Sequence, residues 1–143
     1  MFHTIIIAGN IGRDPEMRYT PAGVAVTSFS VASSRQYSNS QGQPVKETIW
    51  FRVSCWSKQA EYANNYLKKG HKVLIEGRLV PDPNTGGPRI FTRNDGTQSA
   101  SFEVNAVTIR SLTSRSESEG AGNAGGSFPE YSDSALDEDE IPF

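Results

Sequence analysis

The chain has 143 residues, enough for one domain with a modest core, and a formal net charge of −2 at pH 7. A single cysteine and two separated histidines exclude a disulfide framework and offer no metal-ligand spacing, so we expect neither a metal nor a cofactor. No apolar run is long enough to span a membrane and no leader pattern opens the chain, which predicts a soluble cytoplasmic protein.

The net charge conceals two segments of opposite sign. Residues 1–113 carry 13 Lys and Arg against 8 Asp and Glu, a formal charge of +5. Residues 114–143 carry one basic residue against 8 acidic ones, a formal charge of −7. A basic body attracts a polyanion, whereas an acidic tail can mimic one or dock on a basic partner.

The first half of the chain contains two predicted strands before its most informative stretch. Residues 3–8 include three consecutive isoleucines and predict a buried strand, which Gly9, Asn10 and Gly12 are expected to end. Residues 24–35 alternate apolar with small side chains, which predicts a long half-buried strand. Residues 38–46 are rich in Ser, Asn, Gln and Gly, and we expect a flexible loop there.

Asp14 and Glu16 are two residues apart and resemble a catalytic carboxylate pair. The proline between them makes turn formation the simpler explanation. No His, Ser or Cys stands with a base in a catalytic arrangement, so we do not expect an enzyme.

Residues 48–58 predict a strand whose outer face is unusual, because side chains alternate between two faces along a strand. The residues predicted to face the core are Ile49, Phe51, Val53 and Cys55. The residues predicted to face outward are Trp50, Arg52, Ser54, Trp56 and Lys58. This outer face holds both tryptophans of the protein beside two cations. Flat rings next to cations suit a surface that stacks unpaired bases and neutralises phosphates.

Helical spacing of alanine, leucine and tyrosine predicts a helix over residues 58–69, ended by Gly70. Tyr62 and Tyr66 on this helix are expected to be packing residues. The remaining predicted segments are a strand over residues 72–79, a proline-rich loop over 81–88, a short extended arm over 89–93 and a last strand over 99–111.

This order of elements predicts an all-β fold, a five-stranded oligonucleotide/oligosaccharide-binding (OB) barrel with one helix between strands 3 and 4, over residues 1–112. Residues 113–136 are rich in Gly and Ser and lack periodicity, which predicts a disordered linker. Residues 137–143 form an acidic tip that ends in an apolar triplet, for which another protein is the expected partner.

Three stretches of the chain resemble the bacterial single-stranded DNA-binding protein family. They are Gly9 to Tyr19, with the sequence GNIGRDPEMRY; Trp50 to Gly77, which includes WFRV, YLKKG and IEG; and the acidic tip that ends in Ile141, Pro142 and Phe143. The resemblance implies sequence-independent binding and protection of single-stranded DNA in replication, recombination and repair. It also implies a homotetramer associated with the nucleoid.

The resemblance also implies which residues bind. The expected stacking residues are Trp50, Trp56, Tyr37 and, in place of a tryptophan that some members carry after the fourth strand, Phe91. The expected phosphate-binding cations are Arg52 and Lys58, which flank the tryptophans, and also Arg35, Lys69 and Lys72. The expected docking residues for replication, recombination and repair proteins are Asp137, Glu138, Asp139, Glu140, Ile141, Pro142 and Phe143.

Two other functions remain open at this point. The first is an OB-fold adaptor of a replication complex whose main ligand is protein. In that case Trp50 and Trp56 would suit a subunit interface or core. A nuclease domain is a more distant alternative. Quenching of tryptophan fluorescence by oligo-dT distinguishes the DNA-binding reading from both.

Overall fold

The computed structural model describes residues 2–114, and the rest of the predicted linker and the predicted acidic tip lie outside them. The elements are β1 (Ile5–Ile11), β2 (Glu16–Tyr19), β3 (Ala25–Ser38), β4 (Pro44–Trp56), α1 (Ser57–Tyr66), β5 (Lys72–Leu79), β6 (Arg89–Thr92) and β7 (Gln98–Ser111). The strand predicted over residues 72–79 is confirmed at both ends.

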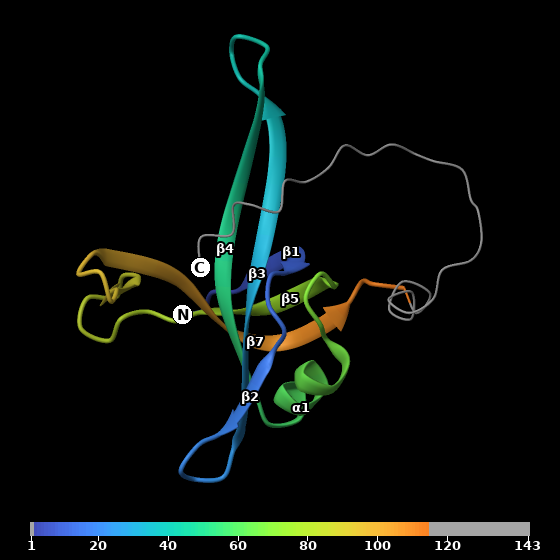
Figure 1. Ribbon diagram of the computed structural model, residues 1–143, viewed down its shortest axis with the longest axis vertical. Helices are drawn as coiled ribbons and strands as arrows, with labels where there is room; N and C mark the ends of the chain where they lie inside the picture. Colours follow the sequence, from blue (N-terminus) through green and yellow to red (C-terminus); the bar gives the residue numbers. More distant parts are fainter. Residues whose placement is uncertain (1, 115–143) are drawn as a thin grey trace. The chain divides into compact units, whose positions relative to one another are not determined.

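Strands β1, β3, β4, β5 and β7 close into a barrel (Figure 1). Their hydrogen-bonded order is β1-β5-β7-β4-β3, and β3 pairs with β1 again to complete the ring. β4 and β7 run parallel, whereas the other neighbours in the ring are antiparallel. α1 lies between the third and fourth barrel strands along the chain, so the predicted OB barrel with its single helix is confirmed.

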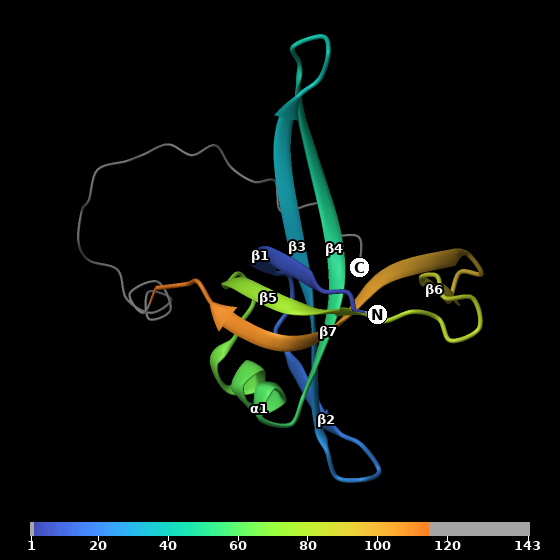
Figure 2. The same cartoon turned by 180° about the vertical axis from the view of Figure 1, so that it is seen from behind.

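Two short strands lie outside the ring. β2 pairs with β3 only, and β6 pairs with β7 only. β6 and the adjoining part of β7 form an arm that reaches away from the barrel, as seen from both sides in Figures 1 and 2.

The core is made by inward-facing strand residues and by one side of α1. It includes Phe51, Val53 and Cys55, which confirms three of the four residues that alternation assigned to the inner face of β4. One buried polar residue joins two elements, because Thr27 Oγ1 on β3 donates a hydrogen bond to the Ala60 carbonyl of α1 at 2.7 Å.

β1 does not end at Gly9 and Asn10, so the prediction was wrong for these two residues, whereas Gly12 does follow the end of the strand. The strand continues to Ile11, and both residues pair with β5. Gly9 is required within the strand by close packing, because a Cβ atom there would lie 2.3 Å from the Ala32 carbonyl oxygen of β3. A glycine in a strand can therefore mark a close backbone approach where a barrel closes, and not only a turn.

β3 and β4 continue beyond the barrel as a long two-stranded hairpin (Figure 1). The loop predicted over residues 38–46 is present but shorter, since strand pairing continues to Ser38 opposite Pro44 and leaves only residues 39–43 between the strands. The Asn39 side chain organises the turn, because its Oδ1 accepts hydrogen bonds from the backbone N–H groups of Gln41 at 3.0 Å and Gln43 at 2.9 Å.

The projection of this hairpin also explains why Ile49 is 46% exposed, contrary to the predicted core position. Pairing of β4 with β7 starts at Phe51, and pairing of β1 with β3 reaches only Ala32. At Ile49 the hairpin therefore extends beyond both β7 and β1, so neither strand covers the inner face of β4 there.

α1 ends at Tyr66, before the predicted end at Lys69. Leu67 is extended and buried in the core, which requires the chain to leave the helix at that point. Gly70 has a positive φ of 87° and donates its N–H to the Ile11 carbonyl, so it turns the chain into β5. Tyr62 packs on the core as predicted, whereas Tyr66 is 66% exposed and packs against the Tyr62 ring, with the ring centres 5.4 Å apart. Within residues 2–114 no helix is long and apolar enough to cross a membrane.

Candidate nucleic-acid interface

The outer surface of β3 and β4 brings both tryptophans together, and we call it the tryptophan face. It is formed by Trp50, Arg52, Ser54 and Trp56 of β4 and by the β3 residues opposite them, Ala32, Ser30, Ser28 and Val26. Trp56 is 46% exposed and Trp50 is half-buried. The alternation predicted for this strand is therefore confirmed on its outer side as well, with an exposed Arg52 between the two indoles.

Small side chains on β3 leave space for the larger tryptophan. Ala32 lies directly opposite Trp50, and Ser30 is its diagonal neighbour on the same face. Trp50 therefore packs across the sheet over a floor of small residues, and this explains how a strand can carry a large indole on its outer side.

A row of paired residues connects Trp50 to a predicted cation on another strand. Asn10 of β1 pairs with Ala32 on one side and with Lys72 of β5 on the other. Because paired residues point to the same face, Lys72 lies on the outer barrel surface three strands from Trp50, roughly 15 Å away at ordinary strand spacing. The structure thus brings Lys72 onto the same continuous surface as the tryptophan.

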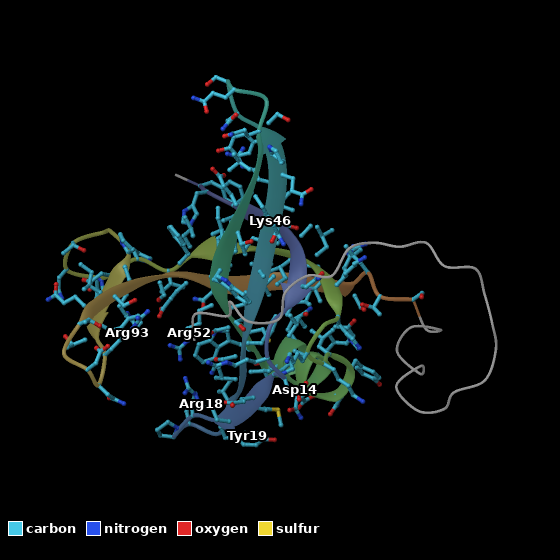
Figure 3. The ribbon with its side chains drawn as sticks, turned by 45° about the horizontal axis from the view of Figure 1, so that its top comes forward. Asp14, Arg18, Tyr19, Lys46, Arg52 and Arg93 are labelled. Carbon is cyan, nitrogen blue, oxygen red and sulfur yellow. The ribbon has the colours of Figure 1, made fainter. Side chains whose placement is uncertain are left out.

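Arg18 on β2 is a basic neighbour of the tryptophan face that the sequence analysis missed. It pairs with Val26, which pairs in turn with Trp56, so Arg18 and Trp56 share one row of the sheet. Figure 3 shows Arg18 and Arg52 toward the same side of the barrel. The sequence carried a signal for Arg18, since it alternates with the half-buried Met17 in a short extended piece.

The arm made by β6 and β7 extends the same face. Glu103 of β7 lies beside Arg52 of β4, and two residues earlier Ser101 pairs with Arg89 of β6. Phe91, two residues beyond Arg89, is on this face and 42% exposed. The structure therefore brings Phe91 onto the outer surface that also carries Trp50 and Trp56.

Charged groups also line this arm. Arg89 forms an ion pair with Glu103 at 3.8 Å, and Arg93 Nη2 donates a hydrogen bond to Ser99 Oγ at 3.1 Å. Along β6 and its turn, an aromatic ring therefore lies between two cations: Phe91 stands between Arg89 and Arg93. Of these three residues, only Phe91 was predicted as a binding residue.

Tyr37 and Arg35 lie on the opposite face of the hairpin from Trp50, because they have the other parity along β3. Glu47 holds both: it accepts a hydrogen bond from Arg35 Nε at 2.8 Å and from the Tyr37 hydroxyl at 3.0 Å. The Arg35 guanidinium also lies 5.0 Å from the centre of the Tyr37 ring. These three residues form one exposed cluster, which we call the hairpin cluster.

The ionisation of the hairpin cluster follows from these bonds. Hydrogen bonds from Arg35 and Tyr37 lower the pKa of the Glu47 carboxyl, because they favour its charged form. The hydrogen bond to Glu47 raises the pKa of the Tyr37 hydroxyl and that of the Arg35 guanidinium. Glu47 therefore stays negative at neutral pH and compensates the charge of Arg35.

The remaining predicted cations, Lys58 and Lys69, lie near the two ends of α1, and Lys58 belongs to the helix because the strand predicted over residues 48–58 ends at Trp56. Lys58 is exposed in the first turn of the helix, two residues after Trp56. Lys69 follows the helix, and its backbone N–H donates a hydrogen bond to Asp14 Oδ1 at 2.8 Å. Asp14, labelled in Figure 3, thus joins two segments far apart in the sequence, a contact different from the local turn predicted for it.

The chemistry that this surface can perform is stacking and charge neutralisation. The residues 2–114 contain no cluster of His, Cys, Asp and Glu that could hold a metal ion. Cys55 is fully buried, and desolvation raises the pKa of its thiol to about 11, so it is not a nucleophile at neutral pH.

Comparison with known proteins identifies the relatives of this chain. The sequence model of the single-strand binding protein family matches residues 2–112. Single-stranded DNA-binding proteins of Neisseria meningitidis and Halalkalibacterium halodurans are both 38% identical to it, over 81% and 90% of this chain. The chain spans 63% of the length of the Neisseria protein and 74% of the Halalkalibacterium protein.

Solved structures give the same picture of the fold. A deletion mutant of the single-stranded DNA binding protein from Thermus aquaticus aligns with 80% of this chain and 52% of its own, at 26% identity and a TM-score of 0.60. A Plasmodium falciparum SSB complex with ssDNA aligns with 79% of this chain and 96% of its own, at 19% identity and a TM-score of 0.63.

Proposed function

The chain belongs to the single-strand binding protein family, and on this premise we propose that it binds single-stranded DNA with little sequence preference and acts without catalysis. The observation that carries the proposal is the tryptophan face, where Trp50 and Trp56 flank the exposed Arg52 on one strand. Stacking on an aromatic side chain contributes about 1–3 kcal/mol per base and does not discriminate, because every base has a π face.

The geometry supports a path for the DNA along the tryptophan face. Trp50 and Trp56 are six residues apart on β4, or roughly 20 Å at the rise of a strand, which leaves room for several nucleotides. Arg52 and Lys58 would neutralise phosphates along this path, with Arg18 beside it.

The bound DNA would continue from the tryptophan face in two directions. Phe91, with the cations beside it, would bind nucleotides on the arm, and Lys72 would bind phosphates across β1. Tyr37 and Arg35 would bind where DNA crosses the edge of the hairpin to its other face, and Lys69 would contact DNA beyond α1. Each of these cations and rings is exposed, as binding requires.

A homotetramer is the assembly we propose. One OB fold covers about 4–16 nucleotides, so several copies would have to act together on a long strand. Ile6 on the outer side of β1 is 67% exposed and, with Leu74, lines a hollow across β1, β5 and β7 that a second copy could cover.

The proposed role in the cell is protection of DNA during replication, recombination and repair, in the cytoplasm and on the nucleoid. The acidic tip, residues 137–143, would recruit proteins of these processes through Phe143 and the acidic residues before it. These tip residues lie outside the described part of the chain.

A fluorescence titration of the intact protein with oligo-dT tests this function. We expect strong quenching of the tryptophan emission at saturation, and an affinity that falls with salt by a log-log slope of about −0.7 per phosphate neutralised. The absence of both quenching and binding would contradict the proposal and would favour an adaptor whose ligand is protein. Oligonucleotide cleavage during the titration would contradict the non-catalytic assignment.

A further inference from the structure

Gly12 follows β1 directly beneath the indole of Trp50. A Cβ atom at this glycine would lie 2.5 Å from Cζ3 and 3.0 Å from Cη2 of the indole, and 2.9 Å from Ser30 Oγ. Real Cβ contacts essentially never fall below 3.0 Å, so a side chain at this position would displace the ring by about half an ångström or more.

The backbone at Gly12 does not itself require glycine, because its φ lies outside the positive range. Its N–H donates a hydrogen bond to the Ser30 carbonyl at 3.0 Å, as any residue could do. The contact that excludes a side chain is therefore with the end of the indole and with the Ser30 hydroxyl. Ser30 Oγ is itself buried, with no hydrogen-bond partner among the described residues.

Gly9, three residues earlier, is a matched contrast. A Cβ atom there would lie 2.3 Å from the Ala32 carbonyl oxygen and 2.8 Å from the Val31 side chain, which are parts of the barrel wall. Gly9 is thus needed for closure of the barrel, whereas Gly12 contacts the ring on which DNA is expected to stack.

We propose that Gly12 is a positioning residue for DNA binding, because its missing side chain, together with Ser30, sets the depth and orientation of Trp50 on the tryptophan face. The inference rests on the proposed function and deepens it. The indole is held half-buried across β3 before DNA arrives, so a base meets an ordered ring. Such preorganisation lowers the entropy cost of stacking.

The test uses the full-length protein with Trp56→Phe, so that all tryptophan emission comes from Trp50. In this background Gly12→Ala should shift the emission of the free protein and weaken oligo-dT binding by about fivefold to twentyfold. Gly9→Ala is the control for a packing defect: it should lower the thermal midpoint, but it should shift the emission less than Gly12→Ala does, because the added Cβ meets the Ala32 backbone and not the ring.

Replacing the indole itself separates positioning from general damage. With Trp50→Phe the two contacting indole atoms are gone, so Gly12→Ala should then change oligo-dT affinity by less than about twofold. An equal loss of affinity with Trp50 and with Phe at position 50 would overturn the inference. So would unchanged emission and affinity in Gly12→Ala.

If Gly12→Ala does not fold, Ser30→Val can replace it in the test, because the larger side chain on β3 would push against the same indole. Ser30→Val should produce the same emission shift, and it should weaken oligo-dT binding only when Trp50 is present. An equal loss of affinity with phenylalanine at position 50 would refute the inference. Failure of the parent protein to bind oligo-dT would contradict the proposed function, whereas the emission shift in free protein would still report on the contact.

Discussion

On the hairpin, the Glu47 carboxylate is expected to weaken DNA binding, because its negative charge repels phosphates. It also accepts hydrogen bonds from both Arg35 and the Tyr37 hydroxyl. Glu47→Gln removes one negative charge and keeps the shape of the side chain; its amide oxygen can still accept from Arg35, and its NH2 group can donate to the Tyr37 hydroxyl. We expect affinity for oligo-dT to rise by about twofold to fivefold at low salt, with the gain disappearing at high salt as exposed charges are screened. Fluorescence titrations at two salt concentrations measure this, and lower affinity at low salt would contradict it.

The difference in oligo-dT affinity between the parent protein and Glu47→Gln should also depend on pH. The pKa of Glu47 is lowered below its ordinary 4.5, so any contribution of its charged form to stability is present above that pH and is lost as pH falls through the lowered value. The affinities of the parent and Glu47→Gln should therefore differ at neutral pH and converge only below pH 4.5.

Cys55 offers a second pH-dependent test. Burial raises the pKa of its thiol to about 11 from an ordinary 9.0, and the thiolate is the reactive form. The folded protein should therefore leave a thiol reagent unreacted at pH 8 and react stoichiometrically once unfolded in denaturant. Rapid reaction of the folded protein would show that β4 opens locally.

Single residues also show how far the sequence could predict the interface. Alternation along β4 was enough to place Trp50, Arg52 and Trp56 outward. The place of Arg18 beside Trp56 and the connection from Lys72 to Trp50 were not predictable in this way, because both depend on which strands pair and in which register. The position of Tyr37 on the opposite hairpin face followed from parity and could have been derived from the sequence.

Among the elements, the contact between β3 and α1 depends on one buried hydroxyl. Thr27 Oγ1 donates to the Ala60 carbonyl at 2.7 Å, and Thr27 is fully buried. Thr27→Val conserves shape but removes the donor, so we expect the free energy of unfolding to fall by about 1–2 kcal/mol. Denaturant unfolding measures this. Thr27→Ser, which keeps the hydroxyl, should retain the hydrogen bond, and a fully stable valine variant would contradict this account.

The existence of each element could be predicted more reliably than its ends. Both ends of β5 were predicted because Gly70 and Pro81 flank a segment with an apolar centre at Val73, Leu74 and Ile75. The end of β1 was missed, since Gly9 serves close packing against β3 and a single sequence does not reveal that contact. The polar composition of residues 38–46 predicts a longer loop than the structure has, because strand pairing continues to Ser38 and Pro44 and the Asn39 side chain orders the turn between them.

At the level of the whole chain, charge separation gives a further prediction. The +5 of residues 1–113 and the −7 of residues 114–143 should attract each other, and DNA would compete with that attraction. Deleting residues 137–143 should therefore raise affinity for oligo-dT at low salt, and less so at high salt. A deletion variant with the parental affinity at low salt would contradict this competition.

The fold of the described residues could be predicted as a whole because three independent signals agree. They are the order of the strands, the position of the helix and the motif stretches around Gly12 and Trp50. The assembly could not be predicted in this way, since the exposed apolar residues of β1 identify a surface but not a copy number.

The most direct test of the account is the affinity of the full-length protein for a fluorescein-labelled oligo-dT when both tryptophans are removed. The label reports binding without relying on tryptophan emission. Trp50→Ala combined with Trp56→Ala should weaken binding by at least about tenfold, given 1–3 kcal/mol per stacked base. Tyr66→Ala removes a ring on α1 that is more exposed than Trp56, and this variant should bind as the parent does. Parental affinity in the double tryptophan variant would contradict the central claim.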